Sequence, residues 1–242
     1  MTLTVVYAIL FYIAAALFTI GVARKIFIYS KTPQPLKIPT TPAPLTKSGV
    51  AWRLIKEVTV FESLFKSNKW IWIFGWMFHL GLFLVLARHL RYFLEPVPTI
   101  ITLIQPFGKY AAFAMIAGLI GLWGRRFFVD RVRYISAMSD HLMLLLLLTI
   151  GISGALMTFG GKALNTDITS VKAFIMGLMF FDLQPIPDSA FLLIHLAMVA
   201  ILLIVFPISK LLHAPGVFFS PTRNQTDDAR EHRHTAGWSA KS

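Results

Sequence analysis

Four histidines stand within or at the end of two long apolar stretches of the sequence. They are His79 and His89 in WIWIFGWMFHLGLFLVLARHLRYF (70–93), and His195 and His213 in FLLIHLAMVAILLIVFPISKLLH (191–213). An imidazole inside the hydrocarbon layer of a membrane is unfavourable unless a ligand or cofactor binds it. Each imidazole can give one axial nitrogen to a haem iron, so two pairs of histidines would ligate two haems.

The spacing within each apolar stretch fits two cofactors better than one. On a straight helix, about 15 Å would separate His79 from His89 along the axis, and about 27 Å would separate His195 from His213. If the two helices run antiparallel, His79 pairs with His213 and His89 pairs with His195. The two axial distances differ by about 12 Å on the same rise per residue, and Pro207, where a kink is expected, lies within the longer one.

The composition is that of a polytopic membrane protein. Of the 242 residues, 56% are hydrophobic and the mean hydropathy is +0.68, far from the values of a soluble domain. The net charge of +12 comes from lysines and arginines beside apolar stretches, so it indicates membrane topology and not nucleic-acid binding. Because the chain has no cysteine, covalent c-type haem, thiolate-bound iron–sulfur clusters and disulfides within it are excluded, and any such cluster would belong to a partner.

The apolar stretches predict an all-α protein, a bundle of five transmembrane helices that binds two stacked haems. The expected helices are 3–23, 70–92, 110–124, 138–160 and 189–213. Residues 1–23 carry no charge, so we expect a retained membrane helix and no cleaved signal peptide. The prolines of EPVPTIITLIQPFG (95–108) predict that no helix runs through that segment.

The basic residues predict the orientation. Of the 23 lysines and arginines, 18 fall on the loops assigned to the cytoplasm and five on the opposite side. We therefore expect a multi-pass protein of the bacterial cytoplasmic (inner) membrane, with the N-terminus outside and the C-terminus inside. Residues 1–213 would form the membrane domain, with a cytoplasmic loop at 24–69, and residues 214–242 a cytoplasmic tail.

Two further stretches are predicted to lie at the membrane surface. Within the cytoplasmic loop, residues 49–65 have the pattern of an amphipathic helix that rests on the membrane or contacts a partner. The stretch 161–188, which contains the short apolar piece AFIMGLMFF, is expected on the outer side as an amphipathic element.

Two arginines flank one of the histidines. Arg88 and Arg91 stand beside His89, where the propionates of a haem would need cations. Reaching from the helix end to the membrane interface explains them equally well.

Other histidines and the tryptophans receive structural interpretations. His141 follows Asp140 at a helix start, and a structural role or a contact with a cytoplasmic arginine is favoured over iron ligation. His232 and His234 lie in the polar tail and are expected to be solvated. Trp70, Trp72 and Trp76 are typical of a belt at the membrane interface.

Three segments resemble a known family. FHLGLFLVLARH (78–89), RVRY (131–134) followed by SDHLMLLLLLTIGISGAL (139–156), and HLAMVAILLIVFPISKLLH (195–213) are similar to the cytochrome b membrane subunit of respiratory nitrate reductase and its relatives. The resemblance implies five helices, two b-type haems and quinone exchange, with the four histidines as haem ligands. It also implies a quinone site at Lys109, with Arg88 as a second candidate. A plain anchor at the start of a helix is the alternative role for Lys109.

The end of the chain resembles a narrower branch of that family. HAPGVFFSPTRNQTDDAREHRH (213–234) is similar to the ending of membrane subunits in the electron-transfer complex associated with dissimilatory sulfite reductase. That likeness implies a cytoplasmic iron–sulfur partner related to heterodisulfide reductase, and it leaves room for other membrane or periplasmic subunits.

Together these features predict a quinone-interacting oxidoreductase subunit of a sulfur-metabolism respiratory complex. Quinone would exchange electrons near the His89/His195 haem, and electrons would pass by the His79/His213 haem to the iron–sulfur subunit. A gamma subunit of a nitrate reductase or of a heterodisulfide reductase-like complex remains open, and so does a non-redox membrane anchor.

Overall fold

The computed structural model describes residues 1–33, 38–162 and 164–228, and all regular structure within them is helical. By length and composition, five helices are able to cross a membrane. They are α1 (Thr2–Lys31), α4 (Lys69–His89), α5 (Thr99–Phe128), α7 (Met138–Phe159) and α9 (Ala190–Val205), with the 3₁₀ turns η1 (Leu90–Tyr92) and η2 (Phe206–Ile208) continuing α4 and α9. The prediction of an all-α chain with five membrane helices is confirmed.

The shorter elements connect or follow these five helices. They are α2 (Lys47–Thr59), α3 (Glu62–Ser67), α6 (Asp130–Ile135), α8 (Ile168–Phe180), η3 (Lys210–Leu212), α10 (His213–Gly216) and η4 (Val217–Phe219). The chain forms two compact units. The first unit contains Met1–Ala16 and Asn68–Ile204, and the second contains Leu17–Ser67 and Val205–Ser242.

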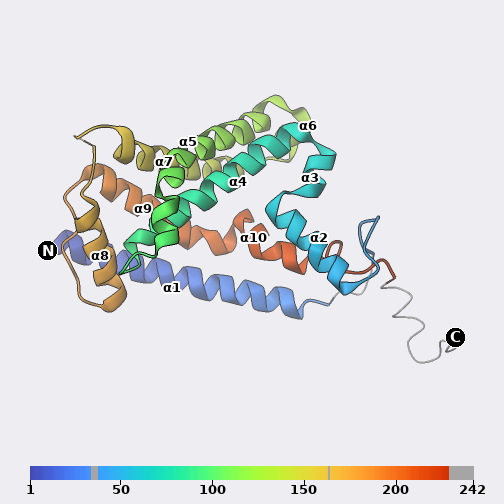
Figure 1. The fold of residues 1–242 in the computed structure, drawn as a ribbon, viewed down its shortest axis with the longest axis horizontal. Coiled ribbons are helices and arrows are strands. Elements are labelled where there is room, and N and C mark those ends of the chain that lie inside the picture. The colour runs from blue at the N-terminus through green and yellow to red at the C-terminus, as the bar shows by residue number, and fades with distance from the viewer. Residues whose placement is uncertain (34–37, 163, 229–242) are drawn as a thin grey trace. The chain divides into compact units, whose positions relative to one another are not determined.

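In the first unit, α4 and α5 pack backbone against backbone (Figure 1). A Cβ placed on Gly81 would lie 2.8 Å from the backbone nitrogen of Met115, and one on Gly118 would lie 2.7 Å from that of Phe78. Glycines allow membrane helices to approach this closely, because the attraction between such helices comes largely from close packing. The two helices can therefore be neighbours at this distance only with hydrogen at these positions.

Helix α7 adds to this pair through a small apolar core. Phe78, Met115, Leu119 and Leu148 form a buried cluster from α4, α5 and α7. A Cβ on Gly151 of α7 would lie 2.7 Å from the Met115 methyl group, so α7 is also fitted closely to α5.

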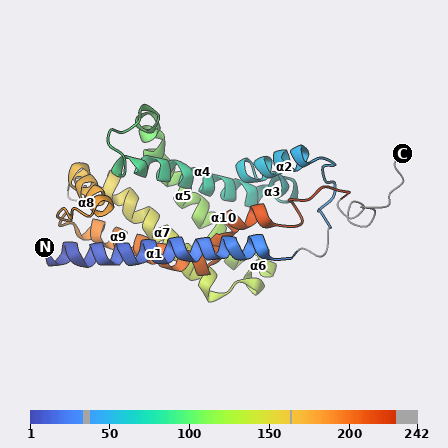
Figure 2. The ribbon, with the colours of Figure 1, turned by 90° about the horizontal axis from the view of Figure 1, so that it is seen from below.

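A second core joins α8, α9 and the first half of α1, which runs alongside α9 (Figure 2). Phe174 of α8 belongs to this core and is 1% exposed. The Tyr7 hydroxyl donates to the Leu193 carbonyl (2.9 Å), and the Tyr12 hydroxyl donates to the Leu178 carbonyl (3.0 Å). Because a buried phenol needs a hydrogen-bond partner, these two bonds fix how α1 sits against the cluster.

Helix α8 begins at a carboxylate cap. Asp167 accepts hydrogen bonds from the backbone nitrogens of Ser170 (2.8 Å) and Thr169 (3.3 Å), and also from the Ser170 hydroxyl. The bonds from Ser170 lower the pKa of this exposed carboxyl. The amphipathic element expected within 161–188 is thus a helix, which buries Val171, Phe174 and Ile175.

Three expected helix boundaries were wrong within the amino-terminal half. Helix α1 does not end at residue 23 but continues to Lys31, because Arg24 and Lys25 are good helix formers. The expected surface helix 49–65 is two helices, α2 and α3, separated where Phe61 adopts a positive φ of 53°.

The helix expected at 110–124 is also longer, since α5 starts at Thr99 and contains Pro106. One proline removes a single helical hydrogen bond, and in a membrane helix a neighbouring helix can support that turn. Here the Gln105 amide donates to the Ile101 carbonyl (3.1 Å) and to the Arg88 carbonyl of α4 (3.3 Å).

The last membrane helix is shorter than predicted. Its α-helical part ends at Val205, and the expected continuation to residue 213 is replaced by 3₁₀ turns on either side of Ser209. Pro207 is the cause, since it cannot donate the hydrogen bond that the next helical turn requires. The axial separation of about 27 Å between His195 and His213, calculated for a straight helix, therefore does not apply.

The glycine contacts lead to a stability prediction. Gly118→Ala should lower the free energy of unfolding by about 1–3 kcal/mol, because the added methyl group meets rigid backbone of α4. Gly124→Ala is the matched control on the same helix, since its nearest neighbour is a Phe128 ring carbon at 3.8 Å. Thermal unfolding in detergent, followed by circular dichroism, would measure both, and equal stability of the two variants would contradict the close packing.

Candidate functional site

The two histidines of α4 are oriented by their own helix. The Nδ1 atom of His79 lies 2.7 Å from the Gly75 carbonyl, and the Nδ1 atom of His89 lies 2.7 Å from the Val85 carbonyl. A carbonyl oxygen only accepts, so each Nδ1 carries the proton. In this tautomer the Nε2 atom has the electron pair that can bind a metal.

His195 of α9 is oriented by a neighbouring helix. The residue is 9% exposed, and its Nδ1 atom lies 2.9 Å from the Ser153 hydroxyl of α7. The Ser153 hydroxyl also donates to the Ile150 carbonyl (3.0 Å), so it accepts from His195 Nδ1. The neighbouring Gly154 keeps this face open, since a Cβ there would lie 3.4 Å from His195 Cε1.

His213 belongs to the second unit and has the same arrangement. It starts α10, and its Nδ1 atom lies 2.8 Å from the Lys210 carbonyl. All four predicted ligands thus direct Nδ1 to an acceptor, which is the arrangement found in metal-bound histidines. Haem iron needs one such nitrogen on each side, so this donor set fits two b-type haems.

His141 has the opposite tautomer. The Trp123 indole nitrogen, which can only donate, bonds to His141 Nδ1 at 3.1 Å, so the ring proton is on Nε2. The arginine contact is made by its neighbour, since Asp140 lies 3.4 Å from Arg126. This contrast supports a structural role for His141.

Of the two predicted pairs, one lies within a single compact unit, since His89 and His195 both belong to the first unit. That they ligate one iron stays a prediction. His79 also lies in the first unit but His213 lies in the second, so their pairing stays a prediction.

The predicted quinone-site residues lie on the touching turns of α4 and α5. A Cβ on Gly108 would be 2.6 Å from the Leu84 carbonyl and 2.7 Å from Arg88 Cβ, so α5 touches the α4 turn before His89 at this glycine. Lys109 is the next residue of α5. The Lys109 ammonium lies 5.1 Å from the centre of the Phe159 ring and 5.7 Å from that of Tyr110. Lys109 therefore stands in the middle of α5 and does not open a helix as expected.

Arg91 and Gln105 add polar groups to this region. The Arg91 guanidinium donates to the Tyr92 hydroxyl (3.0 Å) and covers its ring, while its Nε atom is buried without a hydrogen-bond partner in the described part of the chain. The Gln105 Oε1 atom is likewise buried without such a partner. A buried acceptor without a donor is unfavourable, so Gln105 is suited to receive one from a ligand.

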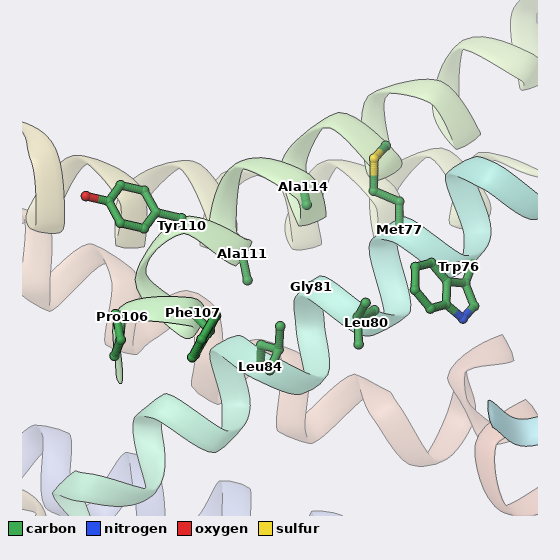
Figure 3. Close-up of a pocket in the computed structure, with 10 residues that line it drawn as sticks. All are labelled: Trp76, Met77, Leu80, Gly81, Leu84, Pro106, Phe107, Tyr110, Ala111 and Ala114. Carbon is green, nitrogen blue, oxygen red and sulfur yellow. The ribbon is translucent and has the colours of Figure 1, made fainter. Parts of the chain in front are cut away.

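An apolar groove runs between α4 and α5 next to these residues (Figure 3). It has a volume of about 420 Å³, and Leu80, Leu84, Phe107 and Tyr110 are among its lining side chains. A groove of this size and composition suits a hydrocarbon chain.

In the second unit, a stripe of α1 supports the segment that contains His213. Phe18 contacts the Phe206 ring at 5.2 Å, and a Cβ on Gly21 would lie 2.5 Å from Pro207 Cβ. Farther along α1, Tyr29 contacts Phe219 at 5.9 Å. These contacts hold the 3₁₀ turns against α1 on both sides of His213.

The loop at 24–69 and the tail also meet in the second unit. Arg223 forms an ion pair with Glu57 (2.6 Å) and donates to the Ser63 hydroxyl (2.6 Å). Farther on, the backbone nitrogen of Asp227 donates to the Pro44 carbonyl (3.1 Å). The described part of the tail is therefore packed on the loop, while His232 and His234 lie outside the described residues.

The remaining sequence predictions are of mixed outcome. Trp72 and Trp76 stack at 5.8 Å and Trp70 is 74% exposed, and an interface belt stays a prediction. Sequence reasoning missed Ser153 and Gln105, although each is a polar residue within an apolar helix and could have been singled out on that ground.

Comparison with known proteins agrees with these features. Residues 49–227 match the nitrate reductase gamma subunit family. The chain is similar to the Hdr-like menaquinol oxidoreductase cytochrome b-like subunit of Archaeoglobus fulgidus, with 37% identity over 94% of this chain and 81% of the relative. The subunit of the same description from Archaeoglobus profundus is 32% identical, over 94% of this chain and 80% of the relative. The chain therefore belongs to the nitrate reductase gamma subunit family.

Proposed function

We propose that this chain is the dihaem cytochrome b subunit of a membrane quinol oxidoreductase and passes electrons from quinol to a cytoplasmic iron–sulfur partner. The observation that carries the proposal is the shared tautomer of His79, His89, His195 and His213, in which Nδ1 carries the proton and Nε2 carries the electron pair that iron binds. The two Archaeoglobus relatives are named for menaquinol oxidoreductases, which favours menaquinol as the substrate.

The ligand pairs follow from antiparallel helices. His89 and His195 would hold the outer haem, and His79 and His213 the inner one. When bound, the haems supply one-electron redox chemistry, while the chain fixes their ligands and surroundings. Arg88 and Arg91 are proposed partners of the outer haem's propionates.

Quinol would bind where α4 and α5 touch. Oxidation of one quinol to quinone releases two electrons and two protons, so the site must hold the hydroxyl groups and let protons leave. Gln105 Oε1 would accept a hydrogen bond from one hydroxyl, with Lys109 and Arg88 as the nearby cations. The apolar groove beside Tyr110 would hold the isoprenoid chain.

The partner would dock on the second unit, which lies on the cytoplasmic side if the N-terminus is outside. Phe218 is 52% exposed, whereas Phe219 packs on Tyr29, so of these two neighbours Phe218 is the one offered to a partner. We propose a heterodisulfide reductase-like iron–sulfur subunit, since both relatives are named as subunits of an Hdr-like menaquinol oxidoreductase. The finer assignment to dissimilatory sulfur metabolism rests on the resemblance of the ending HAPGVFFSPTR.

The haem ligands can be tested by comparing two histidines of opposite tautomer. His89→Ala should remove or loosen the outer haem and abolish haem reduction by quinol analogues, because it deletes an axial ligand. Membrane insertion should be unaffected, since α4 keeps its apolar length. His141→Ala should keep both haems, since Trp123 already bonds its Nδ1. Absorbance spectra of the purified variants would measure this. Normal quinol-linked reduction in His89→Ala would refute the outer quinone site, and a wild-type chain without haem absorbance would favour a non-redox anchor.

Ser153→Ala should weaken haem binding through His195. Loss of the group that orients a metal-bound histidine typically reduces affinity by about 10–100-fold. Thr149→Ala is the control on the same helix, because within the described residues its hydroxyl bonds to the Leu145 and Leu146 carbonyls of its own helix. Haem release to apomyoglobin would be followed, and indistinguishable release from the two variants would argue against His195 as a ligand.

Phe218→Asp should abolish co-purification of the iron–sulfur partner and leave both haem spectra intact. A charge at the centre of an apolar contact is strongly unfavourable once water is excluded. Phe180→Asp, at an exposed phenylalanine of the first unit, is the control. Partner recovery at the wild-type level from Phe218→Asp would show that the contact lies elsewhere.

A further inference from the structure

The second unit contains a cavity of about 660 Å³ beside His213. Its lining combines apolar and aromatic groups with two lysines, and also contains Ser209 and His213. The apolar and aromatic groups include Tyr29, Leu212 and Phe219, and the lysines are Lys25 and Lys210. A cavity with apolar walls and cations fits an amphipathic anion better than a purely apolar chain.

Lys25 is placed in this cavity by the α1 stripe. Phe18, Gly21, Lys25 and Tyr29 are three or four residues apart and share one face of the helix. The flanking members of the stripe contact Phe206, Pro207 and Phe219. Lys25 is therefore the one charged position on a face otherwise used for packing.

The two glutamates that form ion pairs in the second unit are paired with cations other than Lys25. Glu57 pairs with Arg223 (2.6 Å), and Glu62 lies 2.7 Å from Lys56 and 3.0 Å from Lys66. These lysines lower the pKa of Glu62 and keep it ionised. Within the described residues, no carboxylate forms an ion pair with Lys25, although its side chain is partly buried. A partly buried cation in such a setting is stabilised by an external anion.

We propose that Lys25 and Lys210 bind the propionate carboxylates of the haem whose iron His213 ligates. The inference rests on the proposed function, because it requires that haem. The Nδ1 atom of His213 bonds to the carbonyl of Lys210 itself, so the ligand and one of the two cations belong to the same turn. The aromatic pair Tyr29 and Phe219 supplies the apolar wall that a porphyrin plane needs.

The same chemistry could come from the phosphate of an anionic lipid. A lipid would leave the redox properties of the haem nearly independent of Lys25. A propionate would couple them directly, since a cation beside the carboxylate favours the reduced haem, which carries one more negative charge.

Redox titration of Lys25→Ala in the haem-loaded protein tests the assignment. We expect one of the two haems to shift to a lower midpoint potential, or to be lost, while the other is unchanged. Lys25→Arg should retain the wild-type potential because it keeps the charge. Arg24→Ala, an exposed cation at the adjacent position outside the cavity lining, should leave both potentials unchanged.

Native mass spectrometry of the same samples separates the two anion sources. Unchanged potentials in Lys25→Ala overturn the inference, whether or not a bound anionic lipid is lost, and leave the dihaem assignment standing. A wild-type protein with fewer than two haems would instead refute the proposed function. A shift in Arg24→Ala equal to that in Lys25→Ala would also overturn the inference, because it would show a general surface-charge effect.

Discussion

The structure depends on how an imidazole can be kept within apolar helices. A histidine at such a depth needs a partner for its N–H group and a use for its second nitrogen. In this chain, backbone carbonyls at Gly75 and Val85 and the hydroxyl of Ser153 meet the first need. The Lys210 carbonyl does the same for His213, which follows the last membrane helix. The second need is what a haem iron would satisfy. His141 shows the contrast, since its Nδ1 atom accepts a hydrogen bond from the Trp123 indole.

The packing of the helices serves these four positions. Gly81, Gly108 and Gly118 bring α5 against the turns of α4 that lie between and beside His79 and His89. In the second unit, Pro207 ends the last membrane helix before His213, and the α1 stripe then holds the following turns. Helix ends and close crossings thus determine where the ring nitrogens lie, and the neighbouring backbone carbonyls and the Ser153 hydroxyl then determine their tautomers.

Much of the fold and the identity of the candidate ligands could be predicted from the sequence. Hydropathy located five spans, and histidines in apolar stretches are so unfavourable that His79, His89 and His195 stood out without further information. The errors arose where local rules compete with neighbouring helices. Pro106 was expected to bar a helix, but Gln105 and α4 support that turn. Ser153 could not be assigned to His195 beforehand, because the two residues are 42 positions apart and become neighbours only when α7 and α9 are in place.

The haem content of the purified chain tests the central claim most directly. Pyridine haemochrome quantitation against protein concentration, combined with electron paramagnetic resonance of the oxidised protein, reports both the number of haems and their axial ligands. The account predicts two b-type haems per chain, both low-spin with two histidine ligands. One haem per chain, or a high-spin signal from a haem with a single histidine, would contradict it.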